Sequence, residues 1–426
     1  MALVAAVGLL GGCAAEEGPV GVSPRETAVA SLAASLELAS PVHHVDRLAR
    51  EPMLVEHPDG TLFVSGYGSQ SPESSHPKQV PYLWRSGDGG ASWERVDVGT
   101  AAEGAIGNSD VDLAVAGDGT LYFLTMGFDR DTGRGTHIAI GVSHDVGSQW
   151  SWTLLSETEY DDRPWVVVAP GGIAHVVWND GGGVRHAVSS DQGRTWSERE
   201  RIHSRGGSSH LAVGPEGELA VRISPLSASG NRYDEGVDLI VVSTDGGESW
   251  RKHAPPGAAK WPIGFEQFAE LPRWVEPLAW DGAGRLYHLW GDRATLWLGR
   301  SADRGATWES WPIARDNDRI FFPYLVAAGP GELAASWFTG QGESLAVRLA
   351  RVNASPEGGA AEPTVRASEP FQLDVWRAVD GSFVRDTGGE YVALAFLSSG
   401  RLAAATPIQD PGRERFGFSL WLEAAP

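Results

Sequence analysis

Seven copies of a short strand–turn–strand pattern, five of them followed by one repeated octet, predict an all-β fold. We expect a β-propeller of four-stranded antiparallel blades, because each copy supplies two strands and two more flank each octet. Seven blades are favoured, and six is the alternative if one copy is an extra hairpin. No segment of the globular part shows a sustained helical period.

The strand–turn–strand copies are apolar runs rich in β-branched and aromatic residues, each interrupted by a turn that contains glycine. They occupy residues 51–66, 110–125, 162–177, 208–223, 276–290, 322–337 and 380–395. A third strand leads into each octet, and a fourth begins at its tryptophan. We expect residues 415–424 (RFGFSLWLEA) to form the closing strand.

The octet has the pattern Ser-x-Asp-x-Gly-x-(Ser/Thr)-Trp. Its copies stand at residues 86–93, 143–150, 189–196, 243–250 and 301–308. Aspartate accepts hydrogen bonds from backbone N–H groups and so closes a turn, and tryptophan buries a large apolar area between sheets. We therefore assign a structural role to Asp88, Trp93, Asp145, Trp150, Asp191, Trp196, Asp245, Trp250, Asp303 and Trp308.

This octet is similar to the Asp box, or BNR repeat, of the sialidase superfamily. The resemblance spans roughly residues 45–424, and the second copy departs from the pattern at Gln149. The resemblance implies a β-propeller with its boxes on the periphery and with any ligand site at the mouth of the central channel.

The start of each innermost strand is found by counting back nine residues from the turn glycine, or eight in the fifth copy, whose turn is one residue shorter. Five of the seven positions are then acidic: Glu51, Asp110, Asp162, Glu276 and Asp380. One interpretation is that these carboxylates hold backbone N–H groups at each strand start. The other is an acidic ring that binds a cation, a polyol or a basic peptide, with Arg163 as a further binding candidate.

The resemblance implies a catalytic set of three arginines, a tyrosine nucleophile activated by a glutamate, and an aspartate acid/base. Arg50, within Ala49-Arg50-Glu51-Pro52, matches the first arginine, and Tyr324 lies near an inner strand like the nucleophile. Residues 68–81, where the second arginine and the aspartate are expected, contain neither type. An acidic mouth also opposes a sialic acid carboxylate.

The chain has 426 residues, one cysteine and a net charge of -21, which excludes nucleic acid and anionic membrane surfaces as partners. Residues 1–13 resemble a bacterial lipoprotein signal that ends in a lipobox at Cys13, and residues 14–40 suit a flexible tether. We expect an exported protein of the bacterial cell envelope, anchored at Cys13 in the outer membrane or at the cell surface, with its propeller at 41–426.

Three functions remain open. The favoured one is a module that binds a glycan or protein partner at the channel mouth. The second is an exo-acting glycoside hydrolase of the sialidase type, and the third is a structural or assembly factor. In each case we expect a monomer that needs no cofactor or metal and contacts the membrane only through its lipid.

Overall fold

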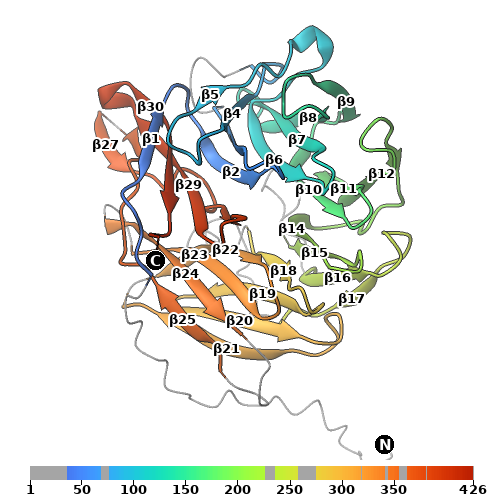
Figure 1. The fold of residues 1–426 in the computed structure, drawn as a ribbon. Coiled ribbons are helices and arrows are strands. Elements are labelled where there is room, and N and C mark those ends of the chain that lie inside the picture. The colour runs from blue at the N-terminus through green and yellow to red at the C-terminus, as the bar shows by residue number, and fades with distance from the viewer. Residues whose placement is uncertain are drawn as a thin grey trace, which may run out of the picture.

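The computed structural model describes residues 36–68, 76–225, 236–257, 275–317, 319–340, 344–354, 362–379 and 381–425. Within these residues the strands form seven four-stranded antiparallel sheets and one separate two-stranded hairpin. Figure 1 shows the sheets arranged as blades around a ring. The seven-bladed propeller is thus confirmed, and the six-bladed alternative is excluded.

Blades 1 to 3 follow the chain from the innermost strand outward. Blade 1 consists of β2 (Arg50–Glu56), β3 (Leu62–Tyr67), β4 (Tyr82–Ser86) and β5 (Glu94–Arg95). Blade 2 consists of β6 (Ser109–Val115), β7 (Leu121–Asp129), β8 (Arg134–Ser143) and β9 (Ser151–Ser156). Blade 3 consists of β10 (Asp161–Ala169), β11 (Ile173–Asp180), β12 (Val184–Ser189) and β13 (Ser197–Glu198).

Blades 4 to 6 repeat this order. Blade 4 consists of β14 (Gly207–Val213), β15 (Leu219–Ser224), β16 (Leu239–Ser243) and β17 (Arg251–His253). Blade 5 consists of β18 (Leu278–Trp280), β19 (Leu286–Asp292), β20 (Thr295–Ser301) and β21 (Glu309–Arg315). Blade 6 consists of β22 (Ile320–Ala327), β23 (Glu332–Thr339), β24 (Ala346–Asn353) and β25 (Thr364–Ala367).

Blade 7 closes the ring with strands from both ends of the propeller. Its order from the outside is β1 (Val42–Val45), β30 (Arg415–Leu422), β29 (Leu402–Asp410) and β28 (Leu394–Phe396). Figure 1 shows blue β1 alongside red β30. The folded part also begins before the predicted boundary at residue 41, because Leu36 is buried and its N–H donates to the carbonyl of Ala367. Residues 1–35, including Cys13, lie outside the described residues.

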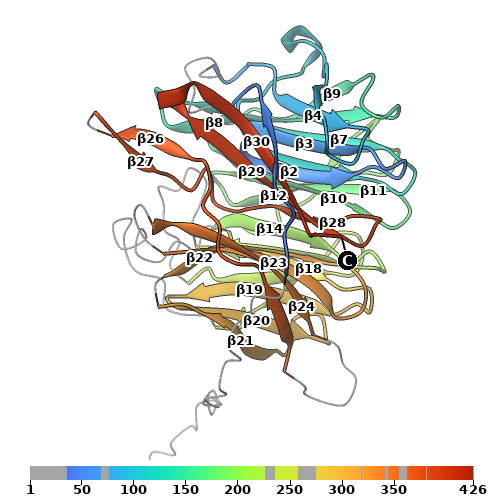
Figure 2. The ribbon, with the colours of Figure 1, turned by 60° about the vertical axis from the view of Figure 1, so that its left-hand side comes forward.

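The seventh strand–turn–strand copy was placed wrongly at 380–395. The inner hairpin of blade 7 is β28–β29, whose turn closes where the N–H of Gly400 donates to the carbonyl of Leu397. Residues preceding it form a separate hairpin of β26 (Trp376–Val379) and β27 (Ser382–Arg385). Figure 2 shows this hairpin projecting from the body of the propeller. The 3-10 turns η2 (Ala101–Glu103) and η5 (Pro411–Arg413) lie between strands.

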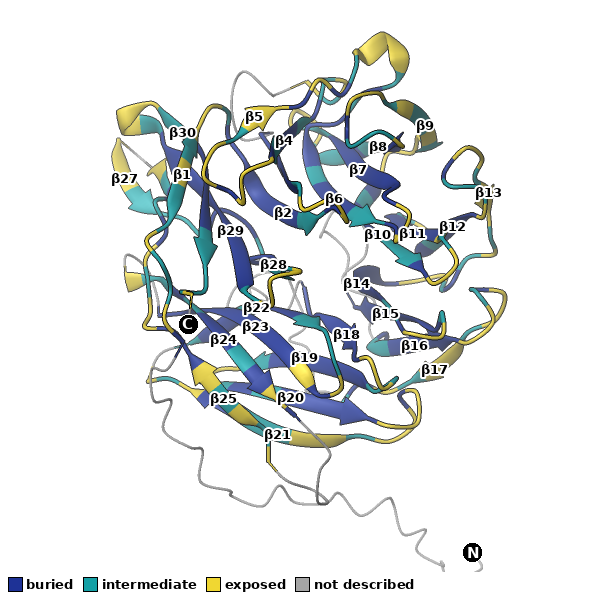
Figure 3. Ribbon diagram, in the orientation of Figure 1, coloured by how far each residue is buried: buried dark blue, intermediate teal, exposed yellow. Residues whose placement is uncertain are grey.

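Burial follows the order of the strands in each blade. Inner strands such as β3 (Leu62–Tyr67) are wholly buried, whereas outer strands such as β5 (Glu94–Arg95) are exposed. Figure 3 shows buried residues lining the ring and exposed ones at its rim. Among the described residues, no helix has the length and apolar character that crossing a bilayer requires.

Candidate functional site

The inner strands all start on one face of the ring, because every blade runs in the same direction from the channel outward. Three of them have a residue in the left-handed backbone region at their second or third position: Glu51 (φ 44), Arg163 (φ 49) and Phe322 (φ 48). Pairing with the second strand shifts register at these points, which marks β-bulges. A β-bulge changes the direction in which the neighbouring side chains point. These three bulges lie at the channel mouth, next to the residues that line it.

Four carboxyl side chains from four blade starts interact at this mouth: Glu51, Asp110, Asp162 and Glu390. Burial raises the pKa of Glu51, and the nearby Asp110 and Glu390 raise it further. Burial, followed by Asp162 and Glu390, raises the pKa of Asp110 to about 7. Burial also raises the pKa of Glu390, although Arg163 opposes this. The carboxyls of this group therefore disfavour one another's ionised forms.

Both arginines at the mouth are already in contact with acidic partners. Arg50 Nη1 donates to Gln409 Oε1 at 2.6 Å and to Asp386 Oδ2 at 3.2 Å. Arg163 Nη2 lies 3.8 Å from Glu390 Oε2, and its Nε lies 4.0 Å from Asp162 Oδ2. Both guanidinium groups are therefore paired with carboxylates of the protein. The sialidase resemblance implied instead that Arg50 binds a carboxylate of the ligand.

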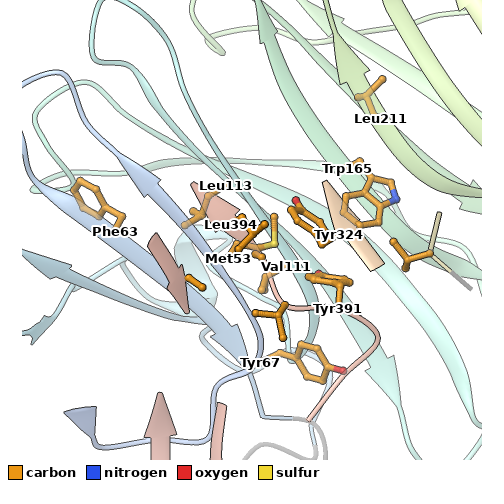
Figure 4. Packing of buried hydrophobic residues seen from close by; sticks show 14 of the residues in the cluster. Met53, Phe63, Tyr67, Val111, Leu113, Trp165, Leu211, Tyr324, Tyr391 and Leu394 are labelled. Atoms are coloured by element: carbon orange, nitrogen blue, oxygen red, sulfur yellow. The ribbon is translucent and has the colours of Figure 1, made fainter. Parts of the chain in front are cut away.

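Aromatic side chains from four blades meet in the channel beneath the carboxyl groups. Ring centroids are 4.9 Å apart for Trp165 and His210, and 5.6 Å apart for His210 and Tyr324. They are 5.3 Å apart for Tyr324 and Tyr391, and 5.8 Å apart for Tyr391 and Trp165. Figure 4 shows Trp165, Tyr324 and Tyr391 together among buried apolar residues. We call this closed circuit of four rings the aromatic floor.

Tyr324 belongs to this floor and is 6% exposed. Burial raises its pKa, and the nearby Asp112 adds to the effect. Asp112 is itself held by the N–H groups of Val166 and Leu113, both at 2.8 Å, while burial raises its pKa to about 7. Burial thus favours the neutral phenol over the phenolate, and the role of Tyr324 as a nucleophile stays a prediction.

Glu276 lies apart from the mouth carboxyls. It is 1% exposed, and its Oε2 accepts from Arg222 Nε at 3.0 Å and Nη2 at 2.6 Å. Arg222 also contacts Asp238. This buried ion pair joins blade 5 to blade 4, so Glu276 is engaged in structure rather than presented to a ligand. Asp380 and residues 69–75 of the 68–81 loop lie outside the described residues.

The mouth also contains residues that sequence reasoning missed: Asp386, Glu390 and Tyr391. All three lie between hairpin β26–β27 and β28, the segment that was assigned to the wrong repeat. A signal for Tyr391 was present, since counting back nine residues from Gly400 leads to it. Asp386 and Glu390 belong to an insertion in the repeat, and no periodic signal identifies them.

The five Asp boxes lie on the opposite face, in the turns between the third and fourth strands of blades 1 to 5. Asp191 Oδ1 accepts from the Thr195 N–H at 2.9 Å, and its Oδ2 accepts from the Thr195 hydroxyl at 2.7 Å. Trp196 meets Tyr122 of the preceding blade with ring centroids 6.3 Å apart. Equivalent bonds occur at Asp88, Asp145, Asp245 and Asp303.

A cleft of about 730 Å³ also opens on the Asp-box face. It is lined by box residues Asp245 and Asp303 and by the turn 282–284. The mouth carboxyls are absent from its lining, so this cleft is separate from the candidate site. Within the described residues, no group of three or more His, Cys, Asp or Glu side chains is arranged to hold a metal ion.

Comparison with known proteins supports the fold. No family model and no curated protein matches the chain. Similar solved structures include Hadza microbial sialidase Hz136, at 16% identity and TM-score 0.45, covering 76% of this chain. This chain spans 66% of that sialidase. An ulvan lyase bound to a saccharide gives 11% identity and TM-score 0.51, covering 89% of this chain and 95% of its own.

A third similar structure is α-L-arabinanase from Penicillium chrysogenum with arabinobiose, at 15% identity and TM-score 0.49, covering 91% of this chain and 98% of its own. Identities this low show likeness of fold alone. The class that the fold defines is a seven-bladed β-propeller, with an acidic channel mouth and a group of aromatic rings in contact with one another.

Proposed function

We propose that this protein binds a glycan at the channel mouth. The observation that carries the proposal is the convergence of Glu51, Asp110, Asp162 and Glu390 above the aromatic floor. Carboxyl groups accept hydrogen bonds from sugar hydroxyls, and aromatic rings offer apolar faces that sugar rings contact.

Binding of immobilised glycans to the wild-type protein tests this proposal. Glu390→Gln removes a carboxylate whose side chain is 33% exposed, so the fold should tolerate it. Glu216→Gln is the matched control, because Glu216 carries the same charge, is 79% exposed and lies in a turn on the Asp-box face. We expect weaker glycan binding by Glu390→Gln and unchanged binding by Glu216→Gln. Equal binding by both variants would place the ligand elsewhere.

Glycoside hydrolysis is the second candidate, and the pKa of Asp110 near 7 favours it. Such a carboxyl can donate a proton at neutral pH while an ionised neighbour stabilises positive charge at the sugar. A panel of fluorogenic glycosides tests this candidate. We expect Asp110→Asn to abolish any release that the wild type shows, whereas Tyr324→Phe should retain it. Loss of release in Tyr324→Phe or Arg50→Ala would instead support a sialidase-type mechanism.

We also propose that the propeller is exported and tethered to the cell envelope through Cys13. The support is the short apolar run that ends in Leu10-Gly11-Gly12-Cys13. Metabolic labelling with a fatty acid should mark the wild type but not Cys13→Ala. Labelling that persists in the variant would contradict anchoring at this residue.

A further inference from the structure

The inner strands of blades 2 to 6 end around a second cavity, on the Asp-box face. This cavity, which we call the axial cavity, has a volume of about 610 Å³. It is lined by the ends of these strands and by the turns that follow them, at residues 115–118, 168–172, 213–215, 280–282 and 328. Most of the lining residues are valine, alanine, proline or glycine, so the axial cavity is largely apolar.

The axial cavity adjoins the cleft of about 730 Å³, because Pro215 and Gly282 line both. The cleft lies between blades 4 and 5, which are neighbours in the ring (Figure 1). Its box carboxylates, Asp245 and Asp303, are held by hydrogen bonds within their own boxes. The guanidinium of Arg304, by contrast, is half exposed in the cleft. Each volume lies in the range of about 300–1,000 Å³ that is typical of ligand sites.

Trp280, the last residue of β18, supplies an independent indication of a ligand. It lines the axial cavity and is 6% exposed, and its indole N–H is buried without a hydrogen-bond partner among the described residues. A buried donor without an acceptor is costly unless a ligand or water supplies one. The indole N–H groups of Trp178 and Trp196 also lack a partner, but neither residue lines the axial cavity or the cleft. At Trp280 the missing acceptor therefore has a cavity to occupy.

The carboxyl groups that line the axial cavity already have donors within the protein. Asp281 Oδ1 accepts from the N–H groups of Ala283 and Arg285, both at 2.9 Å. Asp118 Oδ1 accepts from the Thr120 N–H at 2.9 Å, and this bond lowers the pKa of Asp118. A negatively charged acceptor would meet the ionised Asp118 and would lose its hydration against the apolar lining. The occupant that fits is a small apolar group with one neutral acceptor.

We infer that the Asp-box face holds a second glycan site, which takes a sugar bearing an N-acetyl group. The acetyl methyl lies in the axial cavity, and the acetyl carbonyl accepts from the indole N–H of Trp280. The ring hydroxyls, which both donate and accept, meet the turns and the charged side chains of the cleft. An N-acetyl group combines an apolar methyl with a neutral carbonyl in one compact unit. This site lies apart from the mouth and goes beyond the function proposed there.

Calorimetric titration with three uncharged probes tests the inference. The probes are a β-1,4 tetramer of N-acetylglucosamine, a β-1,4 glucose tetramer and tetra-alanine blocked at both ends. Uncharged probes remove general attraction to a protein whose net charge is -21. We expect the acetylated tetramer to bind about tenfold or more tightly than the glucose tetramer, from one buried methyl and one hydrogen bond. Absence of binding by the acetylated tetramer would overturn the inference.

Trp280→Phe removes the indole N–H and keeps an aromatic ring. We expect its affinity for the acetylated tetramer to fall by about three- to tenfold, the value of one hydrogen bond. Trp178→Phe is the matched control, because Trp178 is 2% exposed, its N–H also lacks a partner, and it lies outside both cavities. The control should retain the wild-type affinity. An equal loss in both variants would overturn the inference.

Gly117→Leu fills part of the axial cavity without a change at Trp280. Gly117 lines this cavity, and a Cβ atom there would meet no atom within 4 Å, so a leucine has room. Gly87→Leu is the control, since Gly87 is equally open and lies in the box of blade 1 on the same face. We expect Gly117→Leu to lose about tenfold or more in affinity and Gly87→Leu to lose none. Wild-type affinity in Gly117→Leu would overturn the inference.

The remaining outcomes are equally distinct. Equal affinity for the two glycans would overturn recognition of the acetyl group. Tighter binding of blocked tetra-alanine than of either glycan would overturn the inference and identify a peptide as the ligand of this face. Loss of affinity in Glu390→Gln but not in Gly117→Leu would also overturn it, and would place the acetylated sugar at the mouth in agreement with the proposed function. Circular dichroism of each variant establishes that a loss of affinity is not a loss of fold.

Discussion

The Glu51 carboxylate accepts a hydrogen bond from the backbone N–H of Glu390 at 2.7 Å, which joins the first blade to the segment before the last. The contact is reinforced in the reverse direction, since the Glu51 N–H donates to the carbonyl of Gly388 at 3.2 Å. Residues from both ends of the propeller therefore build the mouth, and its geometry depends on closure of the ring by β1 and β30.

Asp110→Asn should make the protein more stable at neutral pH. The folded-state pKa of Asp110 is raised to about 7, so its contribution to stability is present below the ordinary aspartate pKa and is lost as pH rises toward 7. Asparagine does not titrate. The free energy of unfolding of Asp110→Asn minus that of the wild type should therefore increase by roughly 1 kcal/mol per pH unit between the ordinary aspartate pKa and pH 7. Urea unfolding across a pH series measures this, and a constant difference would contradict it.

Removal of Glu276 should destabilise the fold strongly. Arg222 is fully buried, and loss of Glu276 leaves Asp238 as the one acidic partner that its guanidinium has among the described residues. We expect Glu276→Leu to cost about 3–5 kcal/mol in the free energy of unfolding. The double variant with Arg222→Met should cost less than the sum of the single changes. Additive costs in denaturant unfolding would show that the pair is not coupled.

The Asp boxes should contribute unequally to stability. Thr195 donates both its N–H and its hydroxyl to Asp191, whereas Gln149 donates only its N–H to Asp145. Asp191→Ala should therefore lower the melting temperature more than Asp145→Ala. The bonds from Thr195 lower the pKa of Asp191 to about 2, so its contribution is present above the ordinary aspartate pKa and is lost as pH falls toward 2.

Neither box variant should change glycan affinity, because the boxes lie on the face opposite the mouth. Thermal melts and calorimetric titration of the same samples check both statements. A loss of binding in Asp191→Ala at a temperature where the protein is folded would argue against a purely structural role for the box.

Tyr391→Phe should separate binding from stability. The hydroxyl has no hydrogen bond among the described residues, so its removal should change the free energy of unfolding by no more than about 0.5 kcal/mol. The affinity for the glycan should nevertheless fall by about three- to tenfold, the value of one hydrogen bond to a ligand. Unchanged affinity would show that the hydroxyl does not face the ligand.

Much of the propeller is predictable from sequence because its signals are local. Each blade repeats a turn, as at Gly60, and blades 1 to 5 also repeat a box, as at Asp88; both patterns can be recognised within a few residues. The seventh repeat was misplaced for the same reason: residues 376–385 form a genuine hairpin, and Gly388 and Gly389 imitate a blade turn. Local patterns do not reveal whether a hairpin belongs to the ring.

The site was predicted less completely than the fold. Counting from the turns found Glu51, Asp110 and Asp162, because the repeat places equivalent residues at equivalent positions. The same count led to Glu276, whose partner Arg222 comes from a neighbouring blade. Pairing between blades is a tertiary property, and so is the approach of Glu390 to Arg163. Sequence periodicity carries no information on either contact.

A crystal structure with a bound glycan tests the central claim most directly. We predict electron density for a sugar ring at the channel mouth, within hydrogen-bonding distance of at least one of Asp110, Asp162 and Glu390. Sugar density confined to the Asp-box face or the outer rim, with an empty mouth, would contradict the account.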